Sequence, residues 1–270
     1  MPRLAVLGHP VAHSRSPAMQ NAALVALGLG EKWRYEAIDV APEGFEARVR
    51  GLVDEDFVGA NVTVPHKHAA LALADAPSEV AREIGAANTL VFVGEEIQAH
   101  NTDADGLLAA LPDSPRGRRA LVLGAGGAAR AVVWALGREG AEVDVWNRTA
   151  ARAEEICAEL GGKPVTEPDQ AGYGLVVNTS AAGLGGEDPF EELPLTADRF
   201  SPEQTVVDMV YGERPSLLLA AAEAAGATVV DGIEILVQQG ALSLRIWTGR
   251  EPPLDVMRTA AHPSRPPHTT

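Results

Sequence analysis

The sequence predicts an α/β protein of two domains, each built around a mainly parallel sheet. Apolar stretches of strand length alternate with helix-length segments along most of the 270 residues, a pattern typical of βαβ units. At roughly 150 residues per domain, this length indicates two domains. Residues 112–117, Pro-Asp-Ser-Pro-Arg-Gly, are the clearest linker in the chain. We therefore expect a domain boundary between residues 104 and 118.

The first half is predicted to alternate strands and helices from its start. A buried strand over residues 4–7 precedes a helix that runs to Leu27, in which Ser16 fits the N-cap and Pro17 the first helical position. Residues 94–96 are expected to form the turn of a hairpin. The other strands are expected at 35–40, 59–64, 89–93 and 97–100, and the other helices at 42–51, 65–74, 77–84 and 104–111.

The second half restarts with a strand over residues 120–123 and a Gly-rich turn. A helix over 233–248 has apolar positions that do not indicate which domain it joins. Residues 261–270 are expected to form a flexible tail. Further helices are predicted at 128–139 and 150–160, and further strands at 142–146, 174–178, 205–210 and 228–230.

Composition and charge exclude several classes of protein. The chain has 22 Lys and Arg against 37 Asp and Glu, a net charge of −15, which argues against nucleic acid or an anionic membrane as a partner. The single cysteine, Cys157, excludes an intrachain disulfide and a cysteine-based zinc site. No apolar run approaches the roughly 18 residues of a membrane span, and the N-terminus lacks a signal-peptide core. We expect a soluble, cytoplasmic protein.

The Gly-rich turn indicates a dinucleotide site. Residues 124–129 read G-A-G-G-A-A and fit the pattern G-x-G-x-x-G/A, in which the third position accepts alanine. The turn follows a strand and opens a helix, so backbone N–H groups and the positive end of the helix would face a pyrophosphate. A tight turn without a ligand is the alternative. The residues expected to take part are Gly124, Ala125, Gly126, Gly127, Ala128 and Ala129.

The end of the next strand indicates which dinucleotide binds. NAD-binding proteins of this type carry an acidic residue about 20 positions after the motif. Asn147, Arg148 and Thr149 occupy that place, and a guanidinium suits a 2′-phosphate, whereas NAD would find no acidic partner. We infer NADP(H) as the cofactor, with Arg152 as a second cation. An ordinary exposed loop arginine is the alternative for Arg148.

Polar residues gather near the carboxyl ends of the predicted strands in the first half, where open α/β sheets bind ligands. Lys67 lies in the first turn of a helix, where the helix dipole disfavours a cation. Held near Asp103, it could protonate the alkoxide formed when a ketone is reduced, and reverse this on oxidation. An exposed lysine, and an Asp103 that caps the next helix, are the alternatives. The histidines form no metal-binding pattern, and we predict no metal.

Spaced motifs across both halves resemble those of shikimate dehydrogenase, in the shikimate/quinate dehydrogenase family. The similarity covers residues 4–250 and keeps the family's order. In the first half the motifs are G-H-P-V-A-H-S-R-S-P-A-M (8–19), N-V-T-V-P-H-K (61–67), G-A-A-N-T (85–89) and N-T-D-A-D-G (101–106). In the second half they are G-A-G-G-A-A (124–129), N-R-T (147–149), D-M-V-Y (208–211) and the stretch from D-G (231–232) to Q-G (239–240).

This resemblance implies the NADPH-dependent reduction of 3-dehydroshikimate to shikimate, on the pathway to chorismate and the aromatic amino acids. It makes Lys67 the proton-transferring residue and Asp103 its partner and a substrate ligand. Ser14 and Ser16 would hold the substrate carboxylate. The residues implied to complete the substrate pocket are Asn61, Thr63, Asn88, Tyr211 and Gln239, and those implied to lie beside the nicotinamide are Met209 and Gly232.

The resemblance also implies how the domains are arranged. Residues 1–103 and 232–260 would form an N-terminal α/β substrate domain, and residues 104–231 a Rossmann-like NADP-binding domain, with the active-site cleft between them. Either a monomer or a homodimer is expected. An NAD-using quinate/shikimate dehydrogenase, an aminoshikimate-type paralogue and a non-catalytic NADP-binding sensor are the alternatives. Lys67 and Asp103 argue against the sensor, which would not need an acid–base pair.

Overall fold

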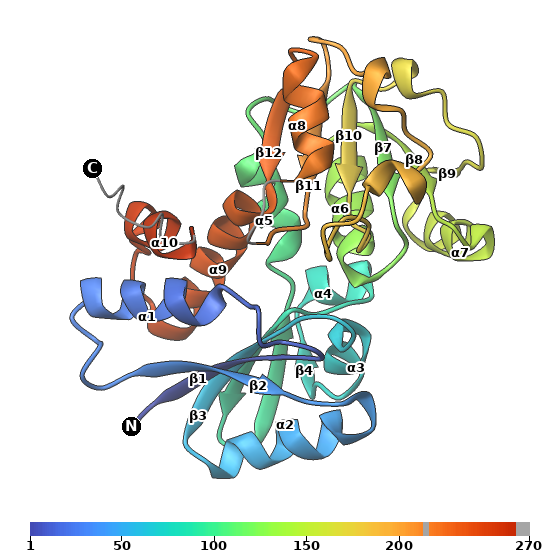
Figure 1. Cartoon of the computed structure of the whole chain (residues 1–270). Helices are drawn as coiled ribbons and strands as arrows, with labels where there is room; N and C mark the ends of the chain where they lie inside the picture. Colours follow the sequence, from blue (N-terminus) through green and yellow to red (C-terminus); the bar gives the residue numbers. More distant parts are fainter. Residues whose placement is uncertain (213–215, 263–270) are drawn as a thin grey trace, which may run out of the picture.

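The computed structural model describes residues 1–212 and 216–262. It confirms the predicted α/β fold, with two six-stranded sheets that lie one below the other in Figure 1. The strand order is β2-β1-β3-β5-β6-β4 in the first sheet and β12-β11-β10-β7-β8-β9 in the second. Most of the predicted tail, residues 263–270, lies outside the described residues. No helix in the described part of the chain has both the length and the apolar character that a membrane crossing requires.

The first sheet is mixed. β1 pairs in parallel with β2 and β3, whereas β5 runs antiparallel to both β3 and β6. The predicted hairpin joins β5 to β6 through Gly94, which has a φ of 62°. The strands are β1 (Arg3–Gly8), β2 (Arg34–Asp39), β3 (Phe57–Val62), β4 (Ala76–Pro77), β5 (Thr89–Val93) and β6 (Glu96–His100).

Helices cover both faces of this sheet. On one face, α2 buries Phe45, Val49 and Leu52, which recur at helical spacing. On the other face, α1 packs against α9 and α10, which come from the far end of the chain and bury Val237 and Met257 in the same apolar cluster. The helices are α1 (Ser16–Ala26), α2 (Phe45–Asp54) after a 3-10 turn (Pro42–Gly44), α3 (Lys67–Ala72), α4 (Glu79–Ile84), α5 (Asp103–Ala110), α9 (Gly232–Thr248) and α10 (Leu254–Ala261).

The second sheet is parallel throughout, and its central strands are buried on both faces, as near-continuous apolar runs predict. Its strands are β7 (Arg119–Leu123), β8 (Glu142–Trp146), β9 (Lys163–Pro164), β10 (Leu175–Asn178), β11 (Thr205–Asp208) and β12 (Thr228–Asp231). Its helices are α6 (Gly127–Arg138), α7 (Ala150–Leu160) and α8 (Leu217–Ala224), with 3-10 turns at Gln170–Gly172, Pro189–Glu191 and Ala197–Arg199.

Several predicted boundaries differ from the structure by a few residues, and two of them have identifiable reasons. The strand predicted over 205–210 stops at Asp208, because the Asp208 carboxylate accepts a hydrogen bond from the N–H of Val210 at 3.1 Å and turns the chain. The helix predicted from Pro77 starts at Glu79. Pro77 instead belongs to the short edge strand β4, and the Ser78 hydroxyl caps α4 by accepting from the N–H of Ala81.

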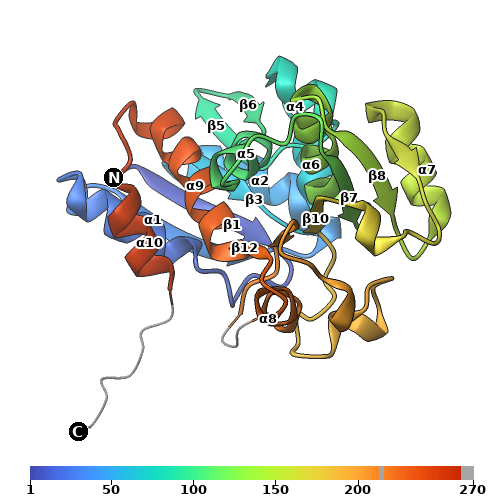
Figure 2. The ribbon, with the colours of Figure 1, turned by 90° about the horizontal axis from the view of Figure 1, so that it is seen from above.

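The two sheets are joined through α4, α5 and α6. Figure 2 shows α5 between α9 and α6, and α5 packs against both of them. Small buried side chains at this junction, including Ala104 and Ala131, let the helices approach closely. Arg130 on α6 is buried there, where its Nε donates to the Ile84 carbonyl at 2.5 Å and its Nη2 pairs with Glu159.

Candidate active site

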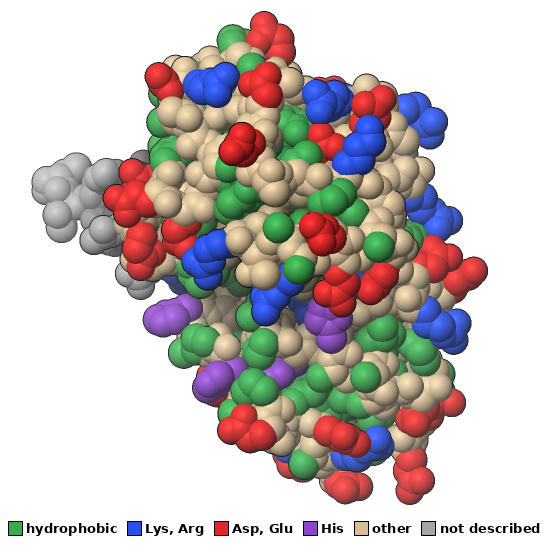
Figure 3. Space-filling view, turned by 90° about the vertical axis from the view of Figure 1, so that its right-hand side faces the viewer, with side chains coloured by type: hydrophobic (Ala, Val, Ile, Leu, Met, Phe, Trp, Pro, Cys, Tyr) green, Lys and Arg blue, Asp and Glu red, His purple; other side chains and the backbone are tan. Residues whose placement is uncertain are grey.

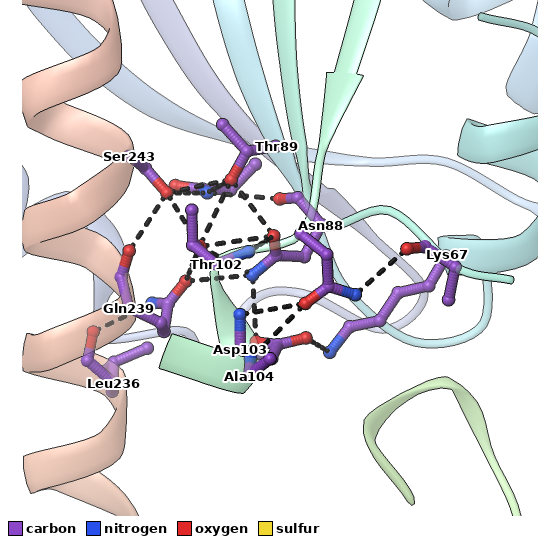
Figure 4. A network of polar contacts seen from close by, with 12 residues as sticks. Lys67, Asn88, Thr89, Thr102, Asp103, Ala104, Leu236, Gln239 and Ser243 are labelled. Atoms are coloured by element: carbon purple, nitrogen blue, oxygen red, sulfur yellow. Dashed lines mark hydrogen bonds and ion pairs between the residues drawn. The ribbon is translucent and has the colours of Figure 1, made fainter. Parts of the chain in front are cut away.

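Lys67 and Asp103 form a buried ion pair at this junction (Figure 4). The Nζ of Lys67, in the first residue of α3, lies 2.7 Å from Oδ2 of Asp103, in the first residue of α5. The two side chains are only 11% and 7% exposed. The alternative of an exposed helical lysine is therefore wrong for Lys67.

Asp103 does not cap α5, which was the alternative for this residue. The Asn101 Oδ1 accepts from the N–H of Asp103 at 3.0 Å and from that of Ala104 at 3.4 Å. The Asn101 Nδ2 donates to the Ala86 carbonyl at 2.9 Å, which fixes the amide. Because Asn101 accepts from the first two N–H groups of the helix, both carboxylate oxygens of Asp103 are available to other side chains.

Asn88 holds the second oxygen of Asp103. Its Nδ2 donates to Asp103 Oδ1 at 2.8 Å, to Thr102 Oγ1 at 3.0 Å and to Gln239 Oε1 at 3.2 Å. Its Oδ1 accepts from the N–H of Thr102 at 2.8 Å, so the orientation of the amide is fixed. The network in Figure 4 thus links Gln239, on α9, to the Lys67–Asp103 pair.

Asn61, on β3, lies in the same region and is 6% exposed. Its Oδ1 accepts from the Tyr35 hydroxyl at 2.8 Å, and its Nδ2 donates to Ser243 Oγ at 2.9 Å and to Thr89 Oγ1 at 3.1 Å. Burial raises the pKa of Tyr35 well above its usual value, so the hydroxyl stays a donor. The amide of Asn61 is therefore already engaged within the protein.

The two serines of the predicted carboxylate site lie at the start of α1. Ser16 was expected to cap this helix, but its side chain makes no capping bond, and Ser14 Oγ accepts from the N–H of Ser16 at 3.3 Å instead. Ser14 also lies near Tyr211, which follows β11, and removal from water raises the pKa of that tyrosine. Thr63 is half-buried in the turn after β3. The structure thus brings Tyr211 to the serines.

The turn from β7 to α6 fits a dinucleotide. Gly124 has a φ of 113°, and a Cβ there would lie 2.6 Å from Thr179 Oγ1, so only glycine suits the position. Gly126, by contrast, faces open space. Apart from its own chain neighbours and the backbone of the adjoining helix, no described atom lies within 4 Å of where a Cβ would be. This space lies beside the first N–H groups of α6, which have no carbonyl partner in the helix and suit a phosphate.

The predicted 2′-phosphate residues follow β8 at the surface. The Asn147 Nδ2 donates to the Thr149 carbonyl at 2.9 Å and closes the turn. The Arg148 side chain is 83% exposed, and its Nη1 lies 3.4 Å from Glu192 Oε2. Arg152 is also exposed, in the first turn of α7. These cations are open to an anionic ligand, and their role remains a prediction.

Met209 and Gly232 lie against each other at the carboxyl edge of the second sheet. A Cβ on Gly232 would lie 2.7 Å from the Met209 carbonyl oxygen, so a side chain does not fit there. The preceding Asp208 is buried and accepts from Asn178 Nδ2 at 2.9 Å and from the Ser216 hydroxyl at 2.5 Å. Burial raises the pKa of Asp208.

Sequence reasoning missed part of the buried network. Asn101 and Thr102 lie in the motif N-T-D-A-D-G but were given no role, whereas Tyr35 and Ser243 lie in none of the motifs. Ser243 does lie four residues after Gln239, a spacing that puts the two on one face of a helix. In the described part of the chain, no group of three or more His, Cys, Asp and Glu side chains is placed to hold a metal ion. The missed residues are Tyr35, Asn101, Thr102 and Ser243.

Comparisons with known proteins agree with this geometry. Residues 6–90 match the family model of the shikimate dehydrogenase substrate-binding domain, residues 108–170 that of shikimate/quinate 5-dehydrogenase, and residues 232–262 that of the shikimate 5′-dehydrogenase C-terminal domain. The shikimate dehydrogenase (NADP(+)) of Methanopyrus kandleri is 44% identical over 273 residues, which cover 94% of this chain and 93% of that protein. The chain belongs to the shikimate dehydrogenase family.

Solved structures of shikimate dehydrogenases have the same fold as this chain. The Aquifex aeolicus enzyme superimposes with a TM-score of 0.91 at 35% identity, over 97% of this chain and 98% of that one. The Thermus thermophilus enzyme, solved in complex with NADP(H) and shikimate, has a TM-score of 0.86 at 43% identity, with the same coverage. These matches confirm the family resemblance that the sequence motifs indicated.

Proposed function

We propose that this chain catalyses the reversible, NADPH-dependent reduction of 3-dehydroshikimate to shikimate, a step in the biosynthesis of chorismate and the aromatic amino acids. The observation that carries the proposal is the buried Lys67–Asp103 pair beside the Gly-rich turn. An acid–base pair next to a dinucleotide site suits the reduction of a ketone. Membership in the family supports the choice of substrate and cofactor.

In this proposal NADPH, when bound, supplies the hydride for the carbonyl carbon. The Gly-rich turn and the N-terminus of α6 would hold its pyrophosphate, and the residues after β8 its 2′-phosphate. The proposed cofactor residues are Gly124, Ala125, Gly126, Gly127, Ala128, Ala129, Asn147, Arg148, Thr149, Arg152, Met209 and Gly232.

Lys67 is proposed to donate a proton to the carbonyl oxygen as negative charge develops there. The neutral amine would take this proton back from the hydroxyl in the reverse reaction. Asp103 fixes Nζ at 2.7 Å and is itself fixed by Asn88, so the proton donor is in place before the substrate arrives. Asp103 would also accept a hydrogen bond from the substrate.

The substrate carboxylate is proposed to bind Ser14 and Ser16. The Ser16 side chain makes no capping bond and Ser14 Oγ only accepts, from the N–H of Ser16, so both hydroxyls can donate to an anion. Tyr211, from the other domain, lies near Ser14 and would close this end of the site. The remaining polar residues would face the ring hydroxyls. They are Asn61, Thr63, Asn88 and Gln239.

We place the substrate domain at residues 1–103 and 232–260 and the NADP-binding domain at residues 104–231. The packing of α9 and α10 on α1 supports this discontinuous division. A cytoplasmic location is part of the proposal, because the pathway and its cofactor belong there. The single cysteine, Cys157, is buried, and burial raises its pKa to about 11, which makes it a weakly reactive thiol.

The test is consumption of NADPH with 3-dehydroshikimate, measured beside NADH with the same substrate and NADP⁺ with shikimate or quinate. We expect turnover with NADPH and 3-dehydroshikimate, and with NADP⁺ and shikimate, at kcat/KM values well above those of the NADH and quinate pairs. Folded protein that binds NADPH but turns over none of these pairs would show that the proposed function is wrong.

A further inference from the structure

We propose that Gly127 is a positioning residue for Lys67, so that the turn that binds the cofactor also sets the position of the proton donor. This inference rests on the proposed function. Gly127 occupies an x position of the pattern G-x-G-x-x-G/A, where the pyrophosphate itself imposes no glycine. The reason why residue 127 is a glycine must therefore lie in a different part of the site.

That part is the aliphatic stem of Lys67. A Cβ on Gly127 would lie 3.0 Å from Cβ of Lys67, 3.2 Å from its Cδ and 3.5 Å from its Cγ. Carbon atoms in good contact lie about 3.5–4.0 Å apart, so even a methyl group at this position would push the stem aside. The backbone of the cofactor turn thus packs directly on the lysine of the other domain.

α6 cannot easily retreat to relieve such a clash. Arg130, one turn further along α6, donates from Nε to the Ile84 carbonyl at 2.5 Å. Three residues after Ile84, the N–H of Ala87 donates to the Lys67 carbonyl at 2.9 Å. The start of α6 and the backbone of Lys67 are therefore tied to the same short segment, residues 84–87.

The other end of Lys67 is also held. Nζ lies 2.7 Å from Asp103 Oδ2, and Asp103 Oδ1 accepts from Asn88 at 2.8 Å. With the backbone and the carboxylate both fixed, a displaced stem has to lengthen or misalign the bond between Nζ and Oδ2. This is the bond that sets where the proton is delivered.

The test compares Gly127→Ala with Gly137→Ala. Gly137 lies in the same helix but is exposed, and no described atom outside its own helix and chain neighbours lies within 4 Å of its Cβ position. Alanine favours helix over glycine at the exposed Gly137, so Gly137→Ala should not melt at a lower temperature. Gly127→Ala is crowded and is assayed at a temperature at which its thermal unfolding curve shows it folded. We expect Gly127→Ala to lower kcat about tenfold, since misplacing a catalytic group by 1 Å can cost roughly 100-fold. Its Kd for NADPH should change much less than kcat, because alanine keeps the backbone N–H that would face the pyrophosphate. Gly137→Ala should keep the wild-type kcat.

A second readout does not depend on turnover. The chain has three lysines, of which Lys67 is buried and Lys32 and Lys163 are exposed. Acetylation by acetic anhydride, measured by mass spectrometry, reports the reactivity of Lys67 relative to the other two. We expect this relative reactivity to rise in Gly127→Ala, where Nζ is loosened from Asp103, and to stay unchanged in Gly137→Ala.

Two results would overturn the inference. One is a Gly127→Ala variant that keeps both kcat and the reactivity of Lys67. The other is a variant that loses affinity for NADPH but keeps kcat at saturation, because Gly127 would then serve only the cofactor. A wild-type protein without turnover would contradict the proposed function alone, since the reactivity of Lys67 still tests the contact with Gly127.

Discussion

Each carboxylate oxygen of Asp103 has its own partner: Oδ2 holds Lys67 and Oδ1 accepts from Asn88. Removing a buried ion pair from water is costly, and the pair persists because the remaining hydrogen-bonding positions are also satisfied. Asn101 makes this possible, since it takes over the capping of α5. At the scale of the residue, Asp103 can hold Lys67 because Asn101, and not Asp103, accepts from the first N–H groups of α5.

The sequence could nominate Lys67 and Asp103 as candidates but could not predict these hydrogen-bond partnerships. A carboxylate at the start of a helix is as good a cap as Asn101, and only the structure shows which residue caps. In the same way, the sequence predicted Ser16 as the cap of α1, and only the structure shows that its side chain makes no capping bond. Ser243 and Tyr35 were missed because a buried hydroxyl acquires its partners from strands and helices distant in sequence, and the chain carries no local signal of that.

Arg148 provides a prediction at this scale. Arg148→Ala should raise the KM for NADPH about tenfold or more, because a charge-assisted hydrogen bond contributes about 1.5–3 kcal/mol. The KM for NADH should not change, since that cofactor lacks the 2′-phosphate. Arg199 pairs with Asp169 at 3.3 Å in the same domain and offers a matched control, Arg199→Ala. An unchanged KM for NADPH in Arg148→Ala would mean that Arg148 is an ordinary surface residue.

Among the elements, α9 leads the chain from the second sheet back to the first. It starts directly after β12 of the second sheet and packs against α5 and against α1 over the first. Gly106 lets it approach α5, because a Cβ there would lie 2.8 Å from the Gln239 nitrogen. Periodicity could not indicate which domain α9 joins, since it has buried residues facing more than one neighbour.

Most elements were predicted with small errors at their ends, because apolar periodicity is strong within an element and weak at its boundary. The two-residue strands β4 and β9 were missed. Segments this short show no periodicity, and their pairing depends on a neighbouring strand that happens to end beside them.

Glu234 gives a prediction at the scale of the element, because it ties α9 to α10. Arg258 donates to both of its oxygens, at 2.7 and 2.9 Å, and these bonds lower the pKa of Glu234. Glu234→Gln should reduce the free energy of unfolding at pH 7 by up to about 1 kcal/mol, as expected for a partly exposed pair.

The pH dependence of this effect has a definite sign. A carboxyl group whose pKa is lower in the folded state stabilises the fold above the usual pKa of glutamate, and it loses this effect as the pH falls through the lowered value. The difference between wild type and Glu234→Gln, measured by urea unfolding, should therefore shrink below pH 4.5. A difference that stays constant down to pH 3 would argue against the ion pair as its cause.

For the whole molecule, the net charge of −15 does not prevent the binding of two anionic ligands. Figure 3 shows Asp and Glu side chains spread over both the upper and lower parts of one face, where solvent and salt screen them. In the proposed function, the donors for the anions are local: the serines of α1 and Lys67 in the first domain, and the Gly-rich turn and Arg148 in the second. Neither domain would then hold a complete site.

The central claim is that Lys67 of one domain transfers the proton in a reduction whose cofactor is held by the other. The most direct test is kcat for 3-dehydroshikimate and saturating NADPH in wild type and Lys67→Ala, with Lys32→Ala as the exposed-lysine control. We predict a loss of about 100-fold or more in kcat for Lys67→Ala, with a modest change in substrate KM. A Lys67→Ala variant that retains kcat would contradict the account.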